Sequence, residues 1–181
     1  MTTYLTYSEN QLKSQNGYWT AKEICQQPIA WRKAADAVDA QRAKISNWLE
    51  PILTKSNLRI ILTGAGTSAY VGESIAPHLS NETNRLVEAI STTEIVSNPN
   101  QYLLPDHPTL LISYGRSGNS PESVAAFNLA NQVIKNIYHL VITCNAQGEL
   151  AIAGQTNENA YTLLMPEETL DQSFAMTSSF T

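Results

Sequence analysis

The amino-acid sequence predicts an α/β protein built on a doubly wound parallel sheet, preceded by an N-terminal helical arm. From Leu58 onward, short runs of branched apolar residues alternate with helical patterns, which is typical of a parallel sheet with helices on both faces. Two of these runs, at 58–62 and 109–114, lead into loops rich in glycine and hydroxyl side chains that open onto helices. Before them, apolar residues recur every seven positions between Trp31 and Ile52, which predicts a long amphipathic helix.

Length and composition narrow the classes of protein to which the chain can belong. A chain of 181 residues with 43% hydrophobic residues is long enough for one domain with a proper core. Its formal net charge of −5 argues against nucleic-acid and anionic-membrane partners, because both favour a basic surface. Cys25 and Cys144 are too few and too far apart for a metal cluster or a disulfide framework. No apolar run is long enough for a signal peptide or a membrane span, so a cytoplasmic location is expected.

Residues 1–55 are expected to form a polar segment and the helical arm, and residues 56–181 the sheet domain. Residues 1–18 are polar and lack a clear period, which indicates a frayed or partner-bound N-terminus. The capping-box pattern Thr20–Glu23 predicts a short helix that ends or restarts at Pro28. The apolar stripe of the helix that follows needs cover, either from the sheet of its own chain or from a second subunit.

The remaining elements are expected to keep the same alternation in chain order. The first glycine loop opens onto a helix that carries Val71, Ile75 and Leu79 on one side. Residues 170–181 have the pattern of a helix just beginning, which indicates that the chain is part of a longer protein. Between these two regions we expect strands at 85–90, 109–114, 138–143 and 160–165, a polar loop at 91–94, a turn at 98–100, a helix at 121–133 and a short helix through Leu150 and Ile152.

Hydroxyl and amide side chains gather in the two glycine loops, and we expect them to bind a phosphate. Glycines let the backbone approach a ligand, and neutral donors beside the free N–H groups of a helix N-terminus bind anions. An arginine there can pair with a phosphate or a sugar oxygen. The alternative is that these are ordinary turn and N-cap residues, with a solvated arginine among them. The candidate binding residues are Gly66, Thr67 and Ser68 in the first loop and Arg116, Ser117, Gly118, Asn119 and Ser120 in the second.

Other patterns in the sequence allow different sites. Gly64–Ala69 also fits the dinucleotide-binding fingerprint, with Glu88 near the spacing of a ribose-binding acid. The second serine-rich loop argues against this, since a dinucleotide needs no such loop further along the chain. Glu94 and Asp171 lie near expected loops and could act on a ligand or be plain surface carboxylates. The three histidines share no spacing with another candidate ligand, so no metal is expected, and no cofactor is expected either.

Several of these motifs, in this order, resemble the sugar-isomerase (SIS) domain family. The family's three loops are similar to Gly64–Ser68, Ser113–Ser120 and Thr143–Asn145, and Phe174–Thr181 resembles the Ser/Thr-rich start of its last helix. Ahead of them, Glu23–Pro28 resembles the helical lead-in of the amino-sugar-phosphate isomerases. Within the family, the chain looks most like the branch of isomerases and deaminases that act on galactosamine 6-phosphate and tagatose 6-phosphate.

The resemblance implies a flavodoxin-like three-layer αβα fold with a phosphosugar at the carboxyl edge of the sheet. It assigns phosphosugar contacts to Thr67 and Ser68 in the first loop and to Ser117 and Ser120 in the second, with Arg116 in place of a glutamine. It also implies that two such halves share one chain and that the catalytic base lies in the second half, beyond these residues.

The chain is then expected to be the binding half of a metal-free isomerase or deaminase that acts on an amino-sugar 6-phosphate. A homodimer or larger assembly, formed through the arm and the SIS domain, is the expected partner state. Two alternatives stay open. One is a non-catalytic SIS module that senses a phosphosugar, and the other is a nucleotide-binding oxidoreductase.

Overall fold

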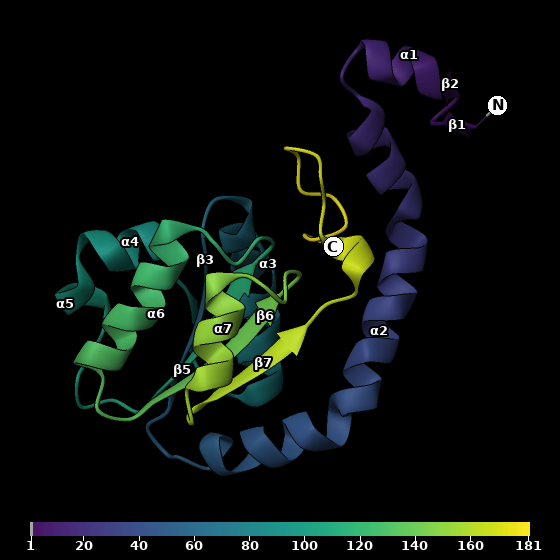
Figure 1. The fold of residues 1–181 in the computed structure, drawn as a ribbon. Coiled ribbons are helices and arrows are strands. Elements are labelled where there is room, and N and C mark those ends of the chain that lie inside the picture. The colour runs from purple at the N-terminus through teal and green to yellow at the C-terminus, as the bar shows by residue number, and fades with distance from the viewer. Residues whose placement is uncertain (1) are drawn as a thin grey trace.

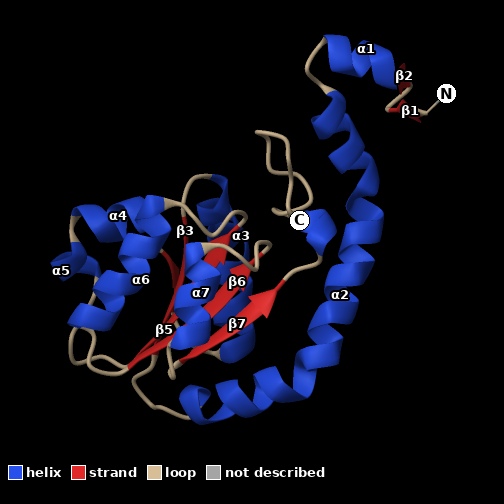
Figure 2. Ribbon diagram, in the orientation of Figure 1, coloured by secondary structure: helices blue, strands red, loops and turns tan. Residues whose placement is uncertain are grey.

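The computed structural model describes residues 2–181 and contains the predicted parallel sheet (Figure 2). Five strands pair in the order β4-β3-β5-β6-β7, and every neighbouring pair is parallel. This is the flavodoxin-like order of doubly wound sheets, so the predicted fold class is confirmed. The strands are β3 (Arg59–Gly64), β4 (Val87–Ala89, shorter than expected), β5 (Thr109–Gly115), β6 (Ile137–Thr143) and β7 (Ala160–Leu164).

Helices cover both faces of this sheet, because successive residues of a buried strand point to opposite sides. In β3, Ile60 and Leu62 pack toward one layer of helices, whereas Ile61 between them packs toward the other. The three layers are visible in Figure 1. One outer layer contains α2 (Tyr18–Leu53) and α3 (Thr67–Thr83); the other contains α4 (Thr92–Ser97), α5 (Pro99–Tyr102), α6 (Pro121–Val133) and α7 (Glu149–Thr156).

The chain reverses its direction across the sheet between β3 and β5. From β3 it crosses through α3 to the edge strand β4, whereas from β5 it crosses through α6 and α7 to β6 and β7 on the other side. The carboxyl ends of β3 and β5 therefore flank the topological switch point, where open α/β sheets leave a crevice for ligands. Both predicted glycine loops begin at these two strand ends.

The arm is one continuous helix, so the expectation of a short helix that stops at Pro28 is wrong. Helix α2 begins at Tyr18 and continues for 36 residues with Pro28 inside it (Figure 1). A proline in a helix removes one backbone donor and crowds the preceding turn. On either side of it, the side chains of Gln26 and Trp31 bond to Glu168 and Thr181 of the C-terminal segment. These tertiary contacts flank Pro28 and stabilise the helix where it continues through the proline.

The predicted capping box at Thr20–Glu23 is also wrong, because both side chains bond to distant residues. The Thr20 hydroxyl lies 2.6 Å from the Ser173 hydroxyl, and the Glu23 carboxylate accepts the backbone N–H of Gln172 at 2.6 Å. The apolar stripe further along α2 is covered by the chain's own sheet in its last turns, where Ile52 is buried in the core.

The N-terminal residues have defined structure, so the expected frayed segment is wrong. Strands β1 (Thr3–Tyr4) and β2 (Tyr7–Ser8) form an antiparallel pair and lead directly into α1 (Glu9–Ser14). Ser8 caps α1 in a capping box with Gln11. These elements are too short to show a period in the sequence. Figure 1 shows them at the far end of α2, away from the sheet domain.

Two further expectations are corrected. The polar stretch 91–94 is not a loop, because Ser91 caps α4 and Glu94 completes its capping box. The expected turn at 98–100 is the junction between α4 and α5. Residues 170–181 form no helix beyond one turn, in which the N–H groups of Phe180 and Thr181 bond to the Thr177 carbonyl. They follow a short 3-10 helix, η1 (Glu167–Thr169), and lie between α2 and the sheet (Figure 1).

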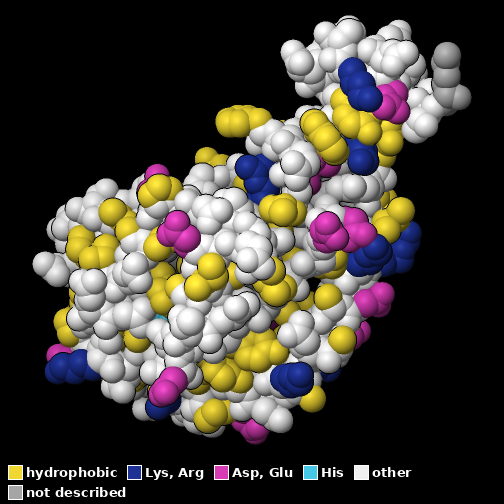
Figure 3. Space-filling view, in the orientation of Figure 1, with side chains coloured by type: hydrophobic (Ala, Val, Ile, Leu, Met, Phe, Trp, Pro, Cys, Tyr) yellow, Lys and Arg dark blue, Asp and Glu magenta, His cyan; other side chains and the backbone are white. Residues whose placement is uncertain are grey.

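Among the helices of residues 2–181, none combines the length with the apolarity that a membrane crossing requires. On the face shown in Figure 3, acidic and basic side chains are interspersed, and neither sign gathers into a large patch.

Candidate functional site

The first loop is shaped by two glycines at the end of β3. A Cβ atom on Gly64 would lie 2.6 Å from backbone atoms of Ser68, so only glycine fits this close turn. Gly66 has a φ of 55°, in the left-handed region, and is the N-cap of α3. The turn leaves Thr67 exposed and buries Ser68 at the first turn of the helix. The loop therefore presents a hydroxyl beside the positive end of the α3 dipole.

The second loop is held in place by the loop that follows β6. Gly118, with a φ of 67°, accepts the N–H of Leu150 on its carbonyl at 2.9 Å. The Asn145 side-chain amide donates to the Ser117 carbonyl, also at 2.9 Å. A Cβ on Gly148 would lie 2.5 Å from that same carbonyl, so the two loops are in direct contact. The backbone of the second loop is therefore fixed without any ligand.

These two loops enclose one pocket at the switch point. Four serine side chains line it: Ser68 on α3, Ser117 and Ser120 in the second loop, and Ser123 on α6. Arg116 adds a positive charge, and Gly118 brings backbone close to the cavity. An anion is the ligand that such a set of neutral donors, one cation and two helix N-termini would bind. The remaining lining comes from Ala65, Tyr114, Gly115 and Met176.

The structure gathers five of the eight predicted binding residues in this pocket: Ser68, Arg116, Ser117, Gly118 and Ser120. The other three lie beside it. Gly66 and Thr67 are exposed at the rim of the first loop, and the Asn119 side-chain oxygen accepts the N–H of Glu149 at 2.9 Å. Asn119 thus accepts a hydrogen bond from a backbone N–H group in the first turn of α7. Ser120 does not cap α6; its hydroxyl bonds to Glu122 at 3.1 Å.

Three residues of the pocket were missed as candidates in the sequence. Tyr114 is the penultimate residue of β5, and burial raises its pKa to about 12, so its hydroxyl stays protonated and can donate. Ser123 follows Ser120 by one helical turn, a spacing that could have indicated it. Met176 comes from the C-terminal segment, and its sulfur lies 3.9 Å from the Ser68 hydroxyl oxygen. No local pattern connects Met176 to the two loops.

The C-terminal segment is anchored by Asp171. Its carboxylate accepts the backbone N–H groups of Thr177, Ser178 and Ser179. Burial acts to raise the pKa of Asp171, but these hydrogen bonds, led by those from Ser179, outweigh it and hold the pKa below its ordinary value. Asp171 is thus an ionised structural acceptor and does not line the pocket. A second contact to the same segment comes from Arg116, whose guanidinium donates to the Ser173 carbonyl at 2.8 Å.

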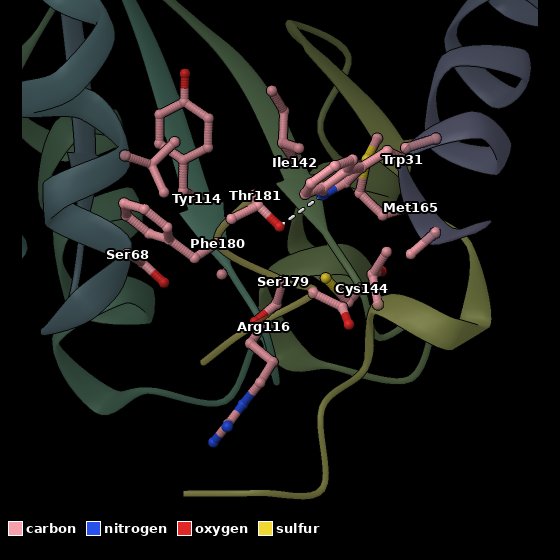
Figure 4. Close-up of a pocket in the computed structure, with 16 residues that line it drawn as sticks. Trp31, Ser68, Tyr114, Arg116, Ile142, Cys144, Met165, Ser179, Phe180 and Thr181 are labelled. Atoms are coloured by element: carbon pink, nitrogen blue, oxygen red, sulfur yellow. Dashed lines mark hydrogen bonds between the residues drawn. The ribbon is translucent and has the colours of Figure 1, made fainter. Parts of the chain in front are cut away.

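A second, more apolar cavity lies next to the pocket, between α2 and the sheet (Figure 4). Trp31, Phe180 and Tyr114 surround it, and the Trp31 indole donates to the Thr181 hydroxyl at 2.8 Å. Cys144 also lines it, and burial raises the pKa of its thiol, so the reactive thiolate is disfavoured. Ser68, Tyr114 and Arg116 border both cavities.

The other candidate residues have structural partners. Hydrogen bonds from Ser91 lower the pKa of Glu94, which serves the capping box of α4. Glu88 forms an ion pair with Arg59 of the neighbouring strand. His139 is fully buried and stacked on Phe127 at 3.9 Å. Within residues 2–181, no three histidine, cysteine or carboxylate side chains are grouped as a metal site would require.

The chain is similar to known proteins in both sequence and fold. The sequence profile of the SIS domain matches residues 52–181. The D-galactosamine-6-phosphate deaminase AgaS of Escherichia coli is 56% identical over 165 residues, which cover 91% of this chain and 43% of that protein. The crystal structure of tagatose-6-phosphate ketose/aldose isomerase from Escherichia coli superimposes with a TM-score of 0.88 at 55% identity, over 92% of this chain and 46% of that one.

A further crystal structure, of a protein from Clostridium novyi NT, superimposes with a TM-score of 0.96 at 51% identity. It matches 99% of this chain and 46% of that one. The chain thus spans less than half the length of the relatives that it matches.

Proposed function

The chain belongs to the SIS domain family, and from that premise we propose that it is the phosphosugar-binding half of an isomerase or deaminase. The substrate we propose is an amino-sugar 6-phosphate such as galactosamine 6-phosphate. The observation that carries the proposal is the convergence of two glycine loops on one pocket at the switch point of the sheet. The names of the relatives, a deaminase and a ketose/aldose isomerase, support the same class of substrate.

The phosphate group would be bound by neutral donors and one cation. Ser68 and Ser117 offer hydroxyl groups to its oxygens, and Ser120 would do so after turning its hydroxyl away from Glu122. The N-termini of α3 and α6 add the favourable ends of two helix dipoles. Arg116 has five N–H donors in a planar fork, which suits a phosphate or a sugar hydroxyl. This arrangement fixes the phosphate end and leaves the sugar carbons toward the open side of the pocket.

The reaction itself needs groups that this pocket lacks. Isomerisation requires ring opening and then proton transfer between C2 and C1 by a base near neutral pKa; in a deaminase, water then releases ammonia. Among the described residues that line the pocket, none is a carboxylate or a histidine. We therefore place the catalytic base outside these residues, in agreement with the greater length of the relatives.

The test is an assay of the full-length protein on galactosamine 6-phosphate, with ammonia and ketose measured separately. Ammonia and a ketose formed together from galactosamine 6-phosphate would establish a deaminase. A ketose formed without ammonia, from an aldose 6-phosphate tested in its place, would establish an isomerase. If neither appears, the enzymatic proposal fails. Tight phosphosugar binding without turnover would instead support a sensing module, which is the alternative within the same family.

We also propose that the protein forms a homodimer through the arm. Trp19 and Trp31 on α2 are 45% and 47% exposed, and Tyr7 of the N-terminal hairpin is 53% exposed. Large aromatic side chains at the surface are common in protein interfaces. Light scattering coupled to size-exclusion chromatography should give twice the monomer mass, and a chain lacking residues 1–17 should shift toward the monomer. A monomeric full-length protein would refute this part.

A further inference from the structure

A buried carboxylate on the arm contacts the C-terminal segment. Glu23 of α2 is only 3% exposed, although a buried glutamate costs free energy unless its oxygens are hydrogen-bonded. One of its carboxylate oxygens accepts the N–H of Gln172 at 2.6 Å and that of Ser173 at 3.1 Å. Glu23 thus binds backbone that lies about 150 residues further along the chain.

Ser173 connects this glutamate to the pocket. Its N–H donates to Glu23, while its carbonyl accepts the Arg116 guanidinium at 2.8 Å. Its hydroxyl lies 2.6 Å from the hydroxyl of Thr20, one turn before Glu23 on α2. Residue 173 is therefore fixed through its donor, its acceptor and its side chain, and two of these three contacts come from the arm.

Arg116 depends on this contact for its orientation. Among the described residues, the Ser173 carbonyl is its one hydrogen-bond acceptor, which leaves the other donors of the guanidinium for a ligand. Arg116 lines the phosphate pocket and follows β5 directly. A long side chain held at one nitrogen loses less conformational freedom when it binds an anion.

We propose that Glu23 is a positioning residue of the phosphosugar site, acting through Ser173 on Arg116. This inference rests on the function proposed above and adds to the SIS domain a group from the arm, since residue 23 lies outside the matched residues 52–181. The carboxylate sets the backbone at Ser173, the Ser173 carbonyl sets the guanidinium, and the guanidinium meets the phosphosugar.

The first test needs no ligand. In the full-length protein, Glu23→Ala should raise the amide hydrogen-exchange rate of residues 170–181, whereas Glu23→Gln keeps an oxygen acceptor and should stay close to wild type. The control is Glu50→Ala, which removes the same charge from an exposed position on the same helix. Unchanged exchange in Glu23→Ala would overturn the proposal. If that variant does not fold, Glu23→Asp, with one methylene fewer, replaces it.

The second test is a double-mutant cycle read by calorimetric titration of galactosamine 6-phosphate. Glu23→Ala should weaken binding about tenfold, the lower end expected for a charge-assisted contact. In an Arg116→Ala background the same substitution should have almost no further effect, because its route to the ligand is gone. A tenfold loss in both backgrounds would mean a general effect on the fold and would overturn the proposal. A wild-type protein that binds no phosphosugar would refute the proposed function, and the exchange result would still report whether Glu23 anchors Ser173.

Discussion

Replacing Ser117 with alanine tests whether the second loop binds a phosphate. The Ser117 hydroxyl faces the pocket and accepts one long hydrogen bond, from the N–H of Asn119 at 3.3 Å, so its own hydrogen is available to a ligand. A hydrogen bond to a charged group contributes about 1.5–3 kcal/mol. Ser117→Ala should therefore weaken the binding of galactosamine 6-phosphate about tenfold to a hundredfold.

The same substitution should leave stability almost unchanged. The backbone of the loop is held by Asn145 and Leu150, not by the Ser117 hydroxyl, so the free energy of unfolding should change by less than about 0.5 kcal/mol. Calorimetric titration of the full-length wild type and variant is the measurement, with galactosamine lacking the phosphate as the ligand control. Ser46→Ala, at an exposed position of α2, is the matched protein control. Equal affinities of wild type and Ser117→Ala would show that the loop is only a turn.

Three further predictions concern stability. Gly64→Ala should cost about 1–3 kcal/mol in urea unfolding, because its Cβ would meet the Ser68 backbone at 2.6 Å; an unaffected variant would mean that the turn is not tight. Burial lowers the pKa of His139 to about 4, so the unfolded chain takes up a proton near pH 6.5 and the folded chain does not. The free energy of unfolding should therefore fall as the pH drops from about 6.5 to about 4, by about 1.4 kcal/mol per pH unit. If His139→Leu lost stability over the same pH range by the same amount, His139 would not be the cause. Ser91→Ala should lower the free energy of unfolding by about 1 kcal/mol, since it removes the N-cap of α4, and Ser46→Ala should not.

The sheet was predictable because its three inner strands, β3, β5 and β6, are largely buried on both faces. A strand such as β3 then shows in the sequence as an apolar run, and Pro121 at the first position of α6 indicates where that helix begins. The short elements gave no comparable signal. The hairpin β1–β2 has two residues in each strand, fewer than any period needs, and α4 has six residues with its capping box mistaken for a loop.

The pocket was predictable only where one local stretch supplies several of its residues. Ser68, Ser117 and Ser120 lie in loops whose glycines already indicate close backbone approach. Met176 is different, because it reaches the pocket from the C-terminal segment, where the motif of hydroxyl residues did not indicate this methionine as a lining residue. Asn119 shows the converse: it has the residue type of a ligand donor and the position of one, yet its oxygen satisfies the N–H of Glu149.

The capping-box pattern Thr20–Glu23 shows why local patterns mislead at such points. A capping box and a tertiary anchor use the same residue types, because hydroxyl and carboxylate oxygens bond equally well to nearby and to distant polar groups. The pattern indicates that these side chains will form hydrogen bonds, but it does not indicate with which partners. Here the partners belong to Gln172 and Ser173, and α2 begins at Tyr18 without them. The hydrogen bonds that a cap would make at one helix end instead stabilise the contact between the arm and the C-terminal segment.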